Sequence, residues 1–289
     1  MSMQQGLSTA VRPWDYSAFQ VSVRRKHQPS PGFIRVTLAG SGLQNFGPWG
    51  LDQRIKLVLP MEDGSMPEFG LLEEPTPHPK YWYARWRNLP ESARNALRTY
   101  TPSAIRPERS EIDIDLYIHE PAGPASRWAL NCEPGERLVI TGPDVRAGQT
   151  GYGIHFAPPQ ALRRLLLVGD ESALPAINNV LTTLGPGTDA EVLLELADPR
   201  DNLLPTGAAR LETTIIQRGA VAGEALETAV RTWGDSQPEP MGDPGFYAWI
   251  AGEATATTNI RRHLTQHLGV PRGHVTFQGY WKLGGSLIG

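Results

Sequence analysis

The sequence contains a single cysteine, Cys132, among its 289 residues. One thiol excludes a disulfide framework, a zinc site built from cysteines and an all-cysteine iron–sulfur cluster, which takes about four thiolates. Such sparse use of cysteine is compatible with a reducing compartment. Cys132 itself is most simply interpreted as a small apolar side chain of the core.

Long apolar runs and a strong charge of one sign are also missing. No stretch approaches the roughly 18 apolar residues of a membrane span, and the first residues, MSMQQGLSTAVRPW, lack the apolar run of a signal peptide. A formal net charge of −3 does not suit a general nucleic-acid binder. We therefore expect a soluble cytoplasmic protein without a nucleic-acid partner or stable membrane insertion.

The first half of the chain shows the alternation of apolar and polar residues that is typical of β-strands. Short strands at this spacing, divided by glycine and proline, predict an antiparallel barrel or sandwich. The segment Met61–Tyr83, rich in Pro, Glu and Gly, runs into the aromatic cluster KYWYARW and is expected to be a long loop that packs through these rings. The expected strands are Phe19–Arg25, Phe33–Leu38, Arg54–Leu59, Glu111–Ile118 and Arg137–Ile140.

The character of the sequence changes after Gly142. Ala147–Gln160, rich in glycine and proline, is expected to be a linker. Apolar runs that alternate with helical patterns then predict a parallel sheet with helices on its faces. The sequence thus predicts a β-barrel domain at 16–146 and an α/β domain at 160–289. The expected strands of the second domain are Arg164–Gly169, Glu191–Ala197, Thr213–Gln217 and Phe246–Ala251, and its expected helices are Asp170–Leu184, Ala222–Trp233 and Thr255–Leu268.

The stretch RTYTP, residues 98–102, has the residue types of a cofactor-binding strand. In a strand, Arg98 and Tyr100 point to one face and Thr99 and Thr101 to the other. A planar heteroaromatic cofactor could stack on the phenol ring while the guanidinium binds its phosphate. The Thr101 hydroxyl could take part only if Pro102 introduces a bend. An ordinary half-exposed strand is the alternative.

A second motif, AGPASRWA, occupies Ala122–Ala129. Its small residues let the backbone approach a ligand closely, and a helix that starts near Ser126 would aim free amides at an anion. A simple turn followed by a helix cap is the alternative. The strand Glu111–Ile118 between the two motifs can bring them to the same rim.

Two strand ends in the second half carry small and acidic residues. GDESALPAI, residues 169–177, follows one apolar strand, and AGEA, residues 251–254, follows another. A strand that ends in glycine and leads into a helix is the usual place for a nucleotide phosphate. The GxGxxG fingerprint is missing, however, and Asp170 and Glu171 would repel phosphate. The two ends suggest one ligand crevice between them.

Taken together, these motifs resemble the siderophore-interacting proteins, flavin-dependent ferric-siderophore reductases of the ferredoxin–NADP reductase-like superfamily. RTYTP, GPASRWA, the strand–GDESALPAI junction, AGEATAT and a terminal GYW carry the resemblance, in that order, from about Phe19 to Trp281. It implies a β-barrel plus α/β fold, with an N-terminal antiparallel FAD-binding barrel followed by a parallel-sheet nicotinamide-binding domain.

The resemblance also implies roles for individual residues. Tyr100 would lie against the isoalloxazine ring, the segment at His119 would line the ribityl or phosphate region, and the first turn after Gly123 would bind the pyrophosphate. After RTYTP the family usually has another arginine, where this chain has Ser103; Arg106 could replace it. The implied cofactor-binding residues are Arg98, Tyr100, Thr101, Pro102, His119, Gly123, Ala125, Ser126, Asp170, Glu171, Ser172, Ala173, Tyr280 and Trp281.

The implied reaction passes a hydride from NADPH or NADH to the flavin and single electrons onward to siderophore-bound Fe(III). The flavin performs the redox step, so no catalytic acid or base is required of the protein. Ferredoxin is an alternative electron donor. The choice between NADPH and NADH stays open, because Arg200 would favour the 2′-phosphate of NADPH whereas Asp198 and Asp201 would repel it. Ferric siderophores are often anionic, so cations near the flavin edge would favour docking. By position, Lys56 is the best match to the family's docking cations, with Arg127 and Arg262 as plausible partners; a solvated strand lysine is the alternative for Lys56.

Other readings of the sequence stay open. A flavoreductase could serve free flavin, a quinone or an electron-transfer protein, and a carrier could bind siderophore or flavin without turnover. His263 and His267, four residues apart on an expected helix, have a spacing that can chelate metal. No third ligand is evident nearby, so a surface pair is favoured and no metal site is predicted. The chain is expected to act as a monomer.

Overall fold

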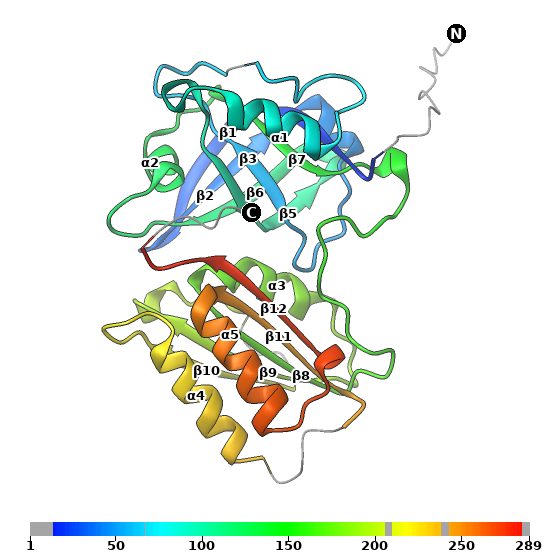
Figure 1. The fold of residues 1–289 in the computed structure, drawn as a ribbon, viewed down its shortest axis with the longest axis vertical. Coiled ribbons are helices and arrows are strands. Elements are labelled where there is room, and N and C mark those ends of the chain that lie inside the picture. Colours follow the sequence, from blue (N-terminus) through cyan, green and yellow to red (C-terminus); the bar gives the residue numbers. More distant parts are fainter. Residues whose placement is uncertain (1–13, 67, 206–209, 238–242, 285–289) are drawn as a thin grey trace.

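The computed structural model describes residues 14–66, 68–205, 210–237 and 243–284. Its N-terminal half is a curled antiparallel sheet, and its C-terminal half is an open parallel sheet flanked by helices (Figure 1). The predicted order of a β-barrel followed by an α/β fold is therefore confirmed. Residues 285–289, which the predicted second domain includes, lie outside the described residues.

The strands of the N-terminal sheet lie in the order β4-β3-β7-β1-β2-β6-β5. Its two edge strands, β4 and β5, are consecutive in the sequence and only Thr101 separates them. One residue cannot bridge the edges of a flat sheet, so the sheet curls until its edges meet at Thr101. The strands are β1 (Tyr16–Ser30), β2 (Phe33–Ala39), β3 (Ile55–Val58), β4 (Leu97–Tyr100), β5 (Pro102–Arg106), β6 (Glu111–Tyr117) and β7 (Arg137–Pro143).

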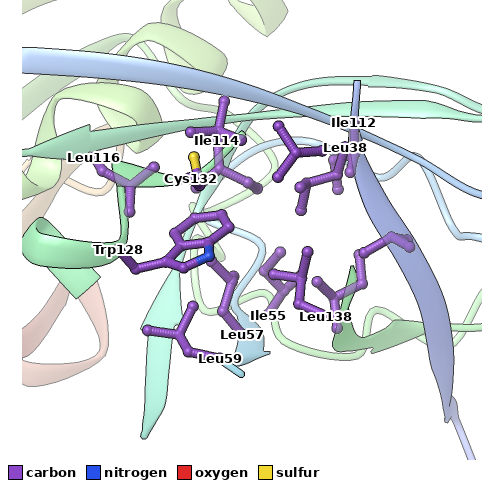
Figure 2. Packing of buried hydrophobic residues seen from close by; sticks show 14 of the residues in the cluster. Leu38, Ile55, Leu57, Leu59, Ile112, Ile114, Leu116, Trp128, Cys132 and Leu138 are labelled. Carbon is purple, nitrogen blue, oxygen red and sulfur yellow. The ribbon is translucent and has the colours of Figure 1, made fainter. Parts of the chain in front are cut away.

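Aliphatic side chains from alternate strand positions fill the curled sheet (Figure 2). The helix α2 (Pro124–Asn131) adds Trp128 and Ala129 to this core, and Trp128 lies beside Leu57 and Leu59. Cys132 is buried in the same cluster, where burial raises the pKa of its thiol to about 11. The predicted role of Cys132 as an apolar core side chain is confirmed.

The parallel sheet has the strand order β10-β9-β8-β11-β12. The apolar run RLLLVG forms β8, the central strand of this sheet. Leu165 and Leu167 pack with α3 on one face, whereas Leu166 and Val168 pack with α4 and α5 on the other. A strand covered on both faces needs apolar residues at every position. The elements are β8 (Arg164–Asp170), α3 (Leu174–Thr183), β9 (Asp189–Leu196), β10 (Leu211–Gln217), α4 (Glu224–Asp235), β11 (Phe246–Glu253), α5 (Ala254–Arg262) and β12 (Val275–Trp281).

The segment between β3 and β4 differs from the expected loop. Its aromatic part forms the helix α1 (Pro79–Asn88), with proline at the first helical position, where a missing N–H costs nothing. Trp82 is buried and donates from Nε1 to Tyr16 Oη at 2.8 Å, so the predicted packing through aromatic rings is confirmed. A cavity of about 580 Å³ lies against this segment, lined by residues such as Phe69, Leu71 and Leu89.

The two halves are joined through buried polar contacts. Asp52, fully buried in the loop before β3, accepts from the backbone N–H groups of His155 and Phe156 at 3.0 Å and from Trp249 Nε1 at 2.9 Å. Asn179 of α3 donates to the carbonyl of Pro102 at 2.8 Å. The α/β domain is thereby held against the closing point of the barrel.

Candidate functional site

RTYTP lies where the two edges of the barrel meet and where α3 contacts it. Tyr100 pairs with Ile55 across β3 and β4, and Arg98 pairs with Leu57, so both side chains share the face of these core residues. β4 ends at Tyr100 and β5 begins at Pro102, which supplies the bend that Thr101 requires. Burial raises the pKa of Tyr100 to about 12 although Arg98 lowers it, so its phenol is neutral at physiological pH.

Arg98 is available to an anion. Its guanidinium donates to the carbonyl of Leu97 at 2.8 Å, and it forms no ion pair with a carboxylate in the part of the chain that the structure describes. An arginine with open donors beside a neutral phenol ring suits a ligand that joins a phosphate to a flat aromatic ring.

Two hydroxyl groups from different domains meet at the same place. Thr101 Oγ1 and Tyr280 Oη are both buried, and neither makes a hydrogen bond of normal geometry. Burial raises the pKa of Tyr280, while Thr101 and Arg54 lower it, which places both residues close to the phenol. The two hydroxyls therefore contact each other with poor hydrogen-bond geometry, which is costly for buried groups, and a polar ligand group at this point would satisfy them better.

The start of α2 offers open backbone amides. The helix begins at Pro124, which corrects the expected start near Ser126, and the free amides of its first turn belong to Ala125 and Ser126. A Cβ atom at Gly123 would lie 3.2 Å from Cε1 of His119, so glycine keeps the approach narrow but open. The imidazole of His119 contacts the carbonyl of Pro121 at 2.9 Å. An anion fits at this helix start.

Asp170 is a buried structural carboxylate. Its Oδ1 accepts from the backbone N–H of Ser172 at 2.9 Å and from its hydroxyl at 2.5 Å, and its Oδ2 accepts from Glu253 N at 3.1 Å and Trp281 Nε1 at 2.8 Å. Burial raises its pKa, which these hydrogen bonds partly offset. The group holds Trp281 in place and presents no free oxygen to a ligand.

Glu171 is likewise committed to contacts within the protein. It accepts from Ala197 N at 2.6 Å and forms an ion pair with Arg218, which also pairs with Glu195 at 3.2 Å. Ser172 and the buried Ala173 complete the turn that leads into α3. Among the four consecutive residues of this turn that the resemblance implies bind cofactor, the two acids therefore contact protein groups instead and could act only through their neighbours.

The three expected docking cations lie on separate elements. Lys56 donates to Thr99 Oγ1 at 3.4 Å on the outer face of β3, and burial, then Arg54, lowers its pKa. Arg127 is exposed and donates to the carbonyl of Ala122 at 2.7 Å. Arg262 is the last residue of α5, which starts at the inter-domain end of β11, so it lies about 12 Å down the helix and away from the barrel.

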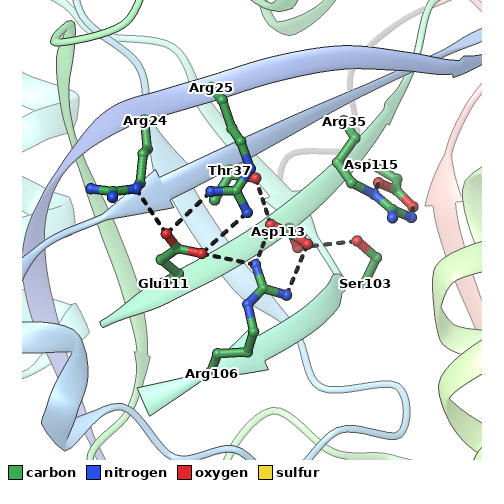
Figure 3. A network of polar contacts seen from close by, with 9 residues as sticks. All are labelled: Arg24, Arg25, Arg35, Thr37, Ser103, Arg106, Glu111, Asp113 and Asp115. Carbon is green, nitrogen blue, oxygen red and sulfur yellow. Dashed lines mark hydrogen bonds and ion pairs between the residues drawn. The ribbon is translucent and has the colours of Figure 1, made fainter. Parts of the chain in front are cut away.

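Arg106 does not stand free to replace the arginine missing at Ser103. Its guanidinium holds Asp113 with contacts of 2.7 and 2.9 Å and reaches Glu111 at 3.4 Å (Figure 3). Ser103 donates to the carbonyl of Asp113 at 3.3 Å. Both residues belong to a polar network on the outer face of β5 and β6.

His263 and His267 stack with their ring centroids 5.5 Å apart on a π-helical turn after α5. Across the described residues, no group of three or more His, Cys, Asp or Glu side chains could hold a metal ion. Within the same residues, no helix combines the length and apolar character needed to cross a membrane.

Three polar residues of the site region were missed by the sequence analysis. Asp52 and Asn179 make the inter-domain contacts, and each stands in an unremarkable loop or helix, so the sequence carries no signal for them. Arg54 could have been found, since it shares a face with Lys56 in the alternating stretch RIKLVL.

An antiparallel barrel that closes at RTYTP and meets the carboxyl end of a parallel sheet is the two-domain fold of the ferredoxin–NADP reductase-like proteins. A siderophore utilization protein from T. fusca has this fold, with a TM-score of 0.75 at 23% identity over 96% of this chain and 97% of that chain.

Comparisons of the sequence narrow the class to a family. Residues 22–147 match the siderophore-interacting FAD-binding domain, and residues 162–284 match the siderophore-interacting protein model. The chain is 29% identical over 262 residues to the NADPH-dependent ferric-chelate reductase of Escherichia coli. This alignment covers 91% of this chain and 92% of that protein. It is 30% identical over 219 residues to the mycobactin import ATP-binding/permease protein IrtA of Mycolicibacterium smegmatis. This alignment covers 75% of this chain but only 24% of IrtA.

The chain belongs to the siderophore-interacting protein family, and FAD is the cofactor of its barrel domain. The residues present fit this group. Arg98 and the open start of α2 suit a diphosphate, Tyr100 offers a ring face, and the buried, poorly hydrogen-bonded hydroxyls of Thr101 and Tyr280 suit polar atoms of the flavin.

Proposed function

We propose that this chain is a ferric-siderophore reductase that passes electrons from NADH or NADPH through FAD to siderophore-bound Fe(III), in the cytoplasm. The name of the Escherichia coli relative, similar along nearly its whole length, supports the activity. The observation that carries the proposal is the barrel closure, where Arg98 and Tyr100 lie next to Thr101, and the buried hydroxyl of Thr101 meets that of Tyr280 from the other domain with poor hydrogen-bond geometry.

The bound flavin supplies the redox chemistry, since it accepts a hydride and returns single electrons. The protein supplies position and charge. Arg98 and the amides of Ala125 and Ser126 would hold the diphosphate, and Tyr100 would pack on the ring system. Asp170 fixes the indole of Trp281 on the side of the α/β domain. None of these residues needs to move a proton.

Docking of the iron complex would use the cationic face of β3. Arg54 and Lys56 are two residues apart on this face, and Arg54 is close enough to Tyr280 to lower the pKa of its phenol. An anionic ferric siderophore would be attracted to this face. After reduction, the iron carries one positive charge less and binds hard oxygen ligands more weakly, which favours its release.

Anaerobic spectroscopy of the purified protein tests the proposal. The preparation should be yellow, NADH or NADPH should bleach it, and a ferric siderophore should restore the colour. Restoration only by free flavin, a quinone or an electron-transfer protein would identify a flavoreductase with another acceptor. A protein that binds siderophore or flavin but is never reduced would be a carrier.

A further inference from the structure

The carboxyl edge of the parallel sheet is where domains of this type usually hold the diphosphate of a dinucleotide. The free amides at a helix N-terminus provide that binding site. Here α3, α4 and α5 begin at this edge, after β8, β10 and β11. At α4 and α5 a carboxylate of the chain itself occupies amides at the helix start, and at α3 a carboxylate occupies an amide in the turn before the helix.

The starts of α5 and α4 are closed by buried glutamates. Glu253, 3% exposed, accepts from the amides of Thr255 at 2.5 Å and Ala256 at 2.9 Å. Glu195, 1% exposed, accepts from the amides of Gly223 at 2.9 Å and Leu226 at 3.3 Å. Each carboxylate satisfies the donors that would otherwise bind a phosphate.

The approach to α3 is closed in the same way. Asp170 accepts from the amide of Ser172 in the turn before the helix, and Pro175 in the first helical turn has no N–H to offer. Glu171 lies in this turn as well, with its carboxylate buried. Burial raises the pKa of both acids, and their hydrogen bonds and the charge of Arg218 partly offset this.

The arginines nearest this edge are also neutralised. Arg218 pairs with Glu171 and Glu195, and it is 18% exposed. Arg200, after β9, forms contacts of 2.5 to 3.0 Å with both carboxylate oxygens of Asp198. Asp201 is buried and accepts from the amide of Gly32 at 2.7 Å. The edge thus combines occupied amides with an excess of carboxylates.

The helix α2 in the barrel domain shows the opposite arrangement. It starts with Gly123 and Pro124, and no side chain among the described residues caps its first turn. The barrel domain therefore presents an open helix start to a diphosphate, while in the α/β domain the protein itself has filled the starts of α4 and α5 and an amide of the turn before α3.

From these contacts we infer that the α/β domain does not bind the adenosine diphosphate half of the electron donor. The donor is recognised by its dihydronicotinamide end alone, at the junction lined by Trp281 and Tyr280. This inference rests on the proposed function. It predicts that NADH, NADPH and reduced nicotinamide mononucleotide are equivalent donors.

Calorimetric titration tests the binding without catalysis. The FAD-loaded full chain is titrated with ADP and with 2′,5′-ADP, and no saturable heat is expected up to about millimolar concentration. Saturable binding in the micromolar range, competed by NADPH, would overturn the inference. As a positive control for the detection of binding heat, the protein freed of its FAD is titrated with FAD, which should bind.

Anaerobic stopped-flow reduction tests the same inference through the donors. The second-order rate constants for NADH, NADPH and reduced nicotinamide mononucleotide should agree within about threefold. A preference of about a hundredfold for a dinucleotide, abolished by 2′,5′-ADP, would contradict it. One result would separate the two proposals: no donor reduces the flavin, yet a ferric siderophore still reoxidises protein whose flavin was reduced by light. The proposed use of NADH or NADPH would then be wrong, and the calorimetric titration alone would decide the inference.

Discussion

Tyr100 and Arg98 are two residues apart on a strand that ends where the barrel closes, so the ring and the guanidinium lie on the same face. Replacing Tyr100 with alanine should weaken FAD binding by about tenfold or more, because the ring face is lost. Tyr100→Phe keeps the ring and should retain the flavin. The FAD dissociation constant of both variants, with circular dichroism as a check on folding, measures this. Equal affinity in Tyr100→Ala would show that the ring does not contact the flavin.

The cationic face of β3 makes a separate prediction. Arg54→Ala and Lys56→Ala should each slow reoxidation of the reduced protein by an anionic ferric siderophore by about three- to tenfold at low salt, and by less at high salt. Reduction of the flavin by NADH should stay unchanged. Arg262→Ala is the matched control, since this arginine ends α5 far from the barrel. A similar loss in Arg262→Ala would contradict this placement of the docking face.

At the scale of elements, the outer face of β5 and β6 carries a polar network that stabilises the barrel beside the site. Asp113, 6% exposed, accepts from Arg106 through both oxygens and from the hydroxyl of Thr37 at 2.7 Å. Burial raises the pKa of Asp113, but these hydrogen bonds outweigh it and hold the pKa below its ordinary value.

This network predicts a dependence of stability on pH. A carboxyl group whose pKa is lowered by folding contributes stability above its unfolded pKa of about 3.9, and loses it as the pH falls through the folded value. Asp113→Asn should therefore lower the free energy of unfolding by about 2 kcal/mol at neutral pH, and the difference should shrink below about pH 4. Urea denaturation across this range measures it, with the exposed Asp189→Asn as a control of little effect. A constant difference at every pH would contradict the assignment.

The elements were largely predictable because their patterns are local. The continuous run RLLLVG predicts a strand covered on both faces, and the alternation in EIDIDLYI predicts a barrel strand with Ile112 and Ile114 inside. The helix α1 escaped prediction because proline and glutamate surround it, and its stability depends on tertiary burial of Trp82. The edge strand β12 escaped because its outer position leaves polar residues among the apolar ones.

The site was predictable only where a motif carried it. RTYTP and GPASRWA contain the residues whose backbone or ring would contact the flavin directly in the proposed site, so their types are restricted. The pairing of Glu171 with Arg218, or of Arg106 with Asp113, joins residues far apart in sequence or on neighbouring strands, and no local pattern announces it. The sequence therefore indicated acids near the crevice, but it could not show that these acids are engaged in hydrogen bonds and ion pairs within the protein.

At the scale of the whole molecule, Asp52 links the barrel, the linker and the α/β sheet. Replacing it with alanine would leave the amides of His155 and Phe156 and the indole of Trp249 without an acceptor. The free energy of unfolding should fall by about 3 kcal/mol, and Asp52→Asn, which keeps one oxygen, should lose less. Guanidinium denaturation monitored by tryptophan fluorescence measures both. An unchanged Asp52→Ala protein would show that the two domains are held together elsewhere.

The proposed activity requires electrons to cross the junction between the two domains, from a nicotinamide donor to FAD and on to chelated iron. The most direct measurement is an anaerobic cycle followed by visible absorption with a ferrous-iron trap present. We predict that NADH or NADPH bleaches the flavin, that a ferric siderophore restores it, and that two ferrous ions form for each donor consumed. A flavin that stays reduced in the presence of a ferric siderophore, with no ferrous iron trapped, would contradict the account.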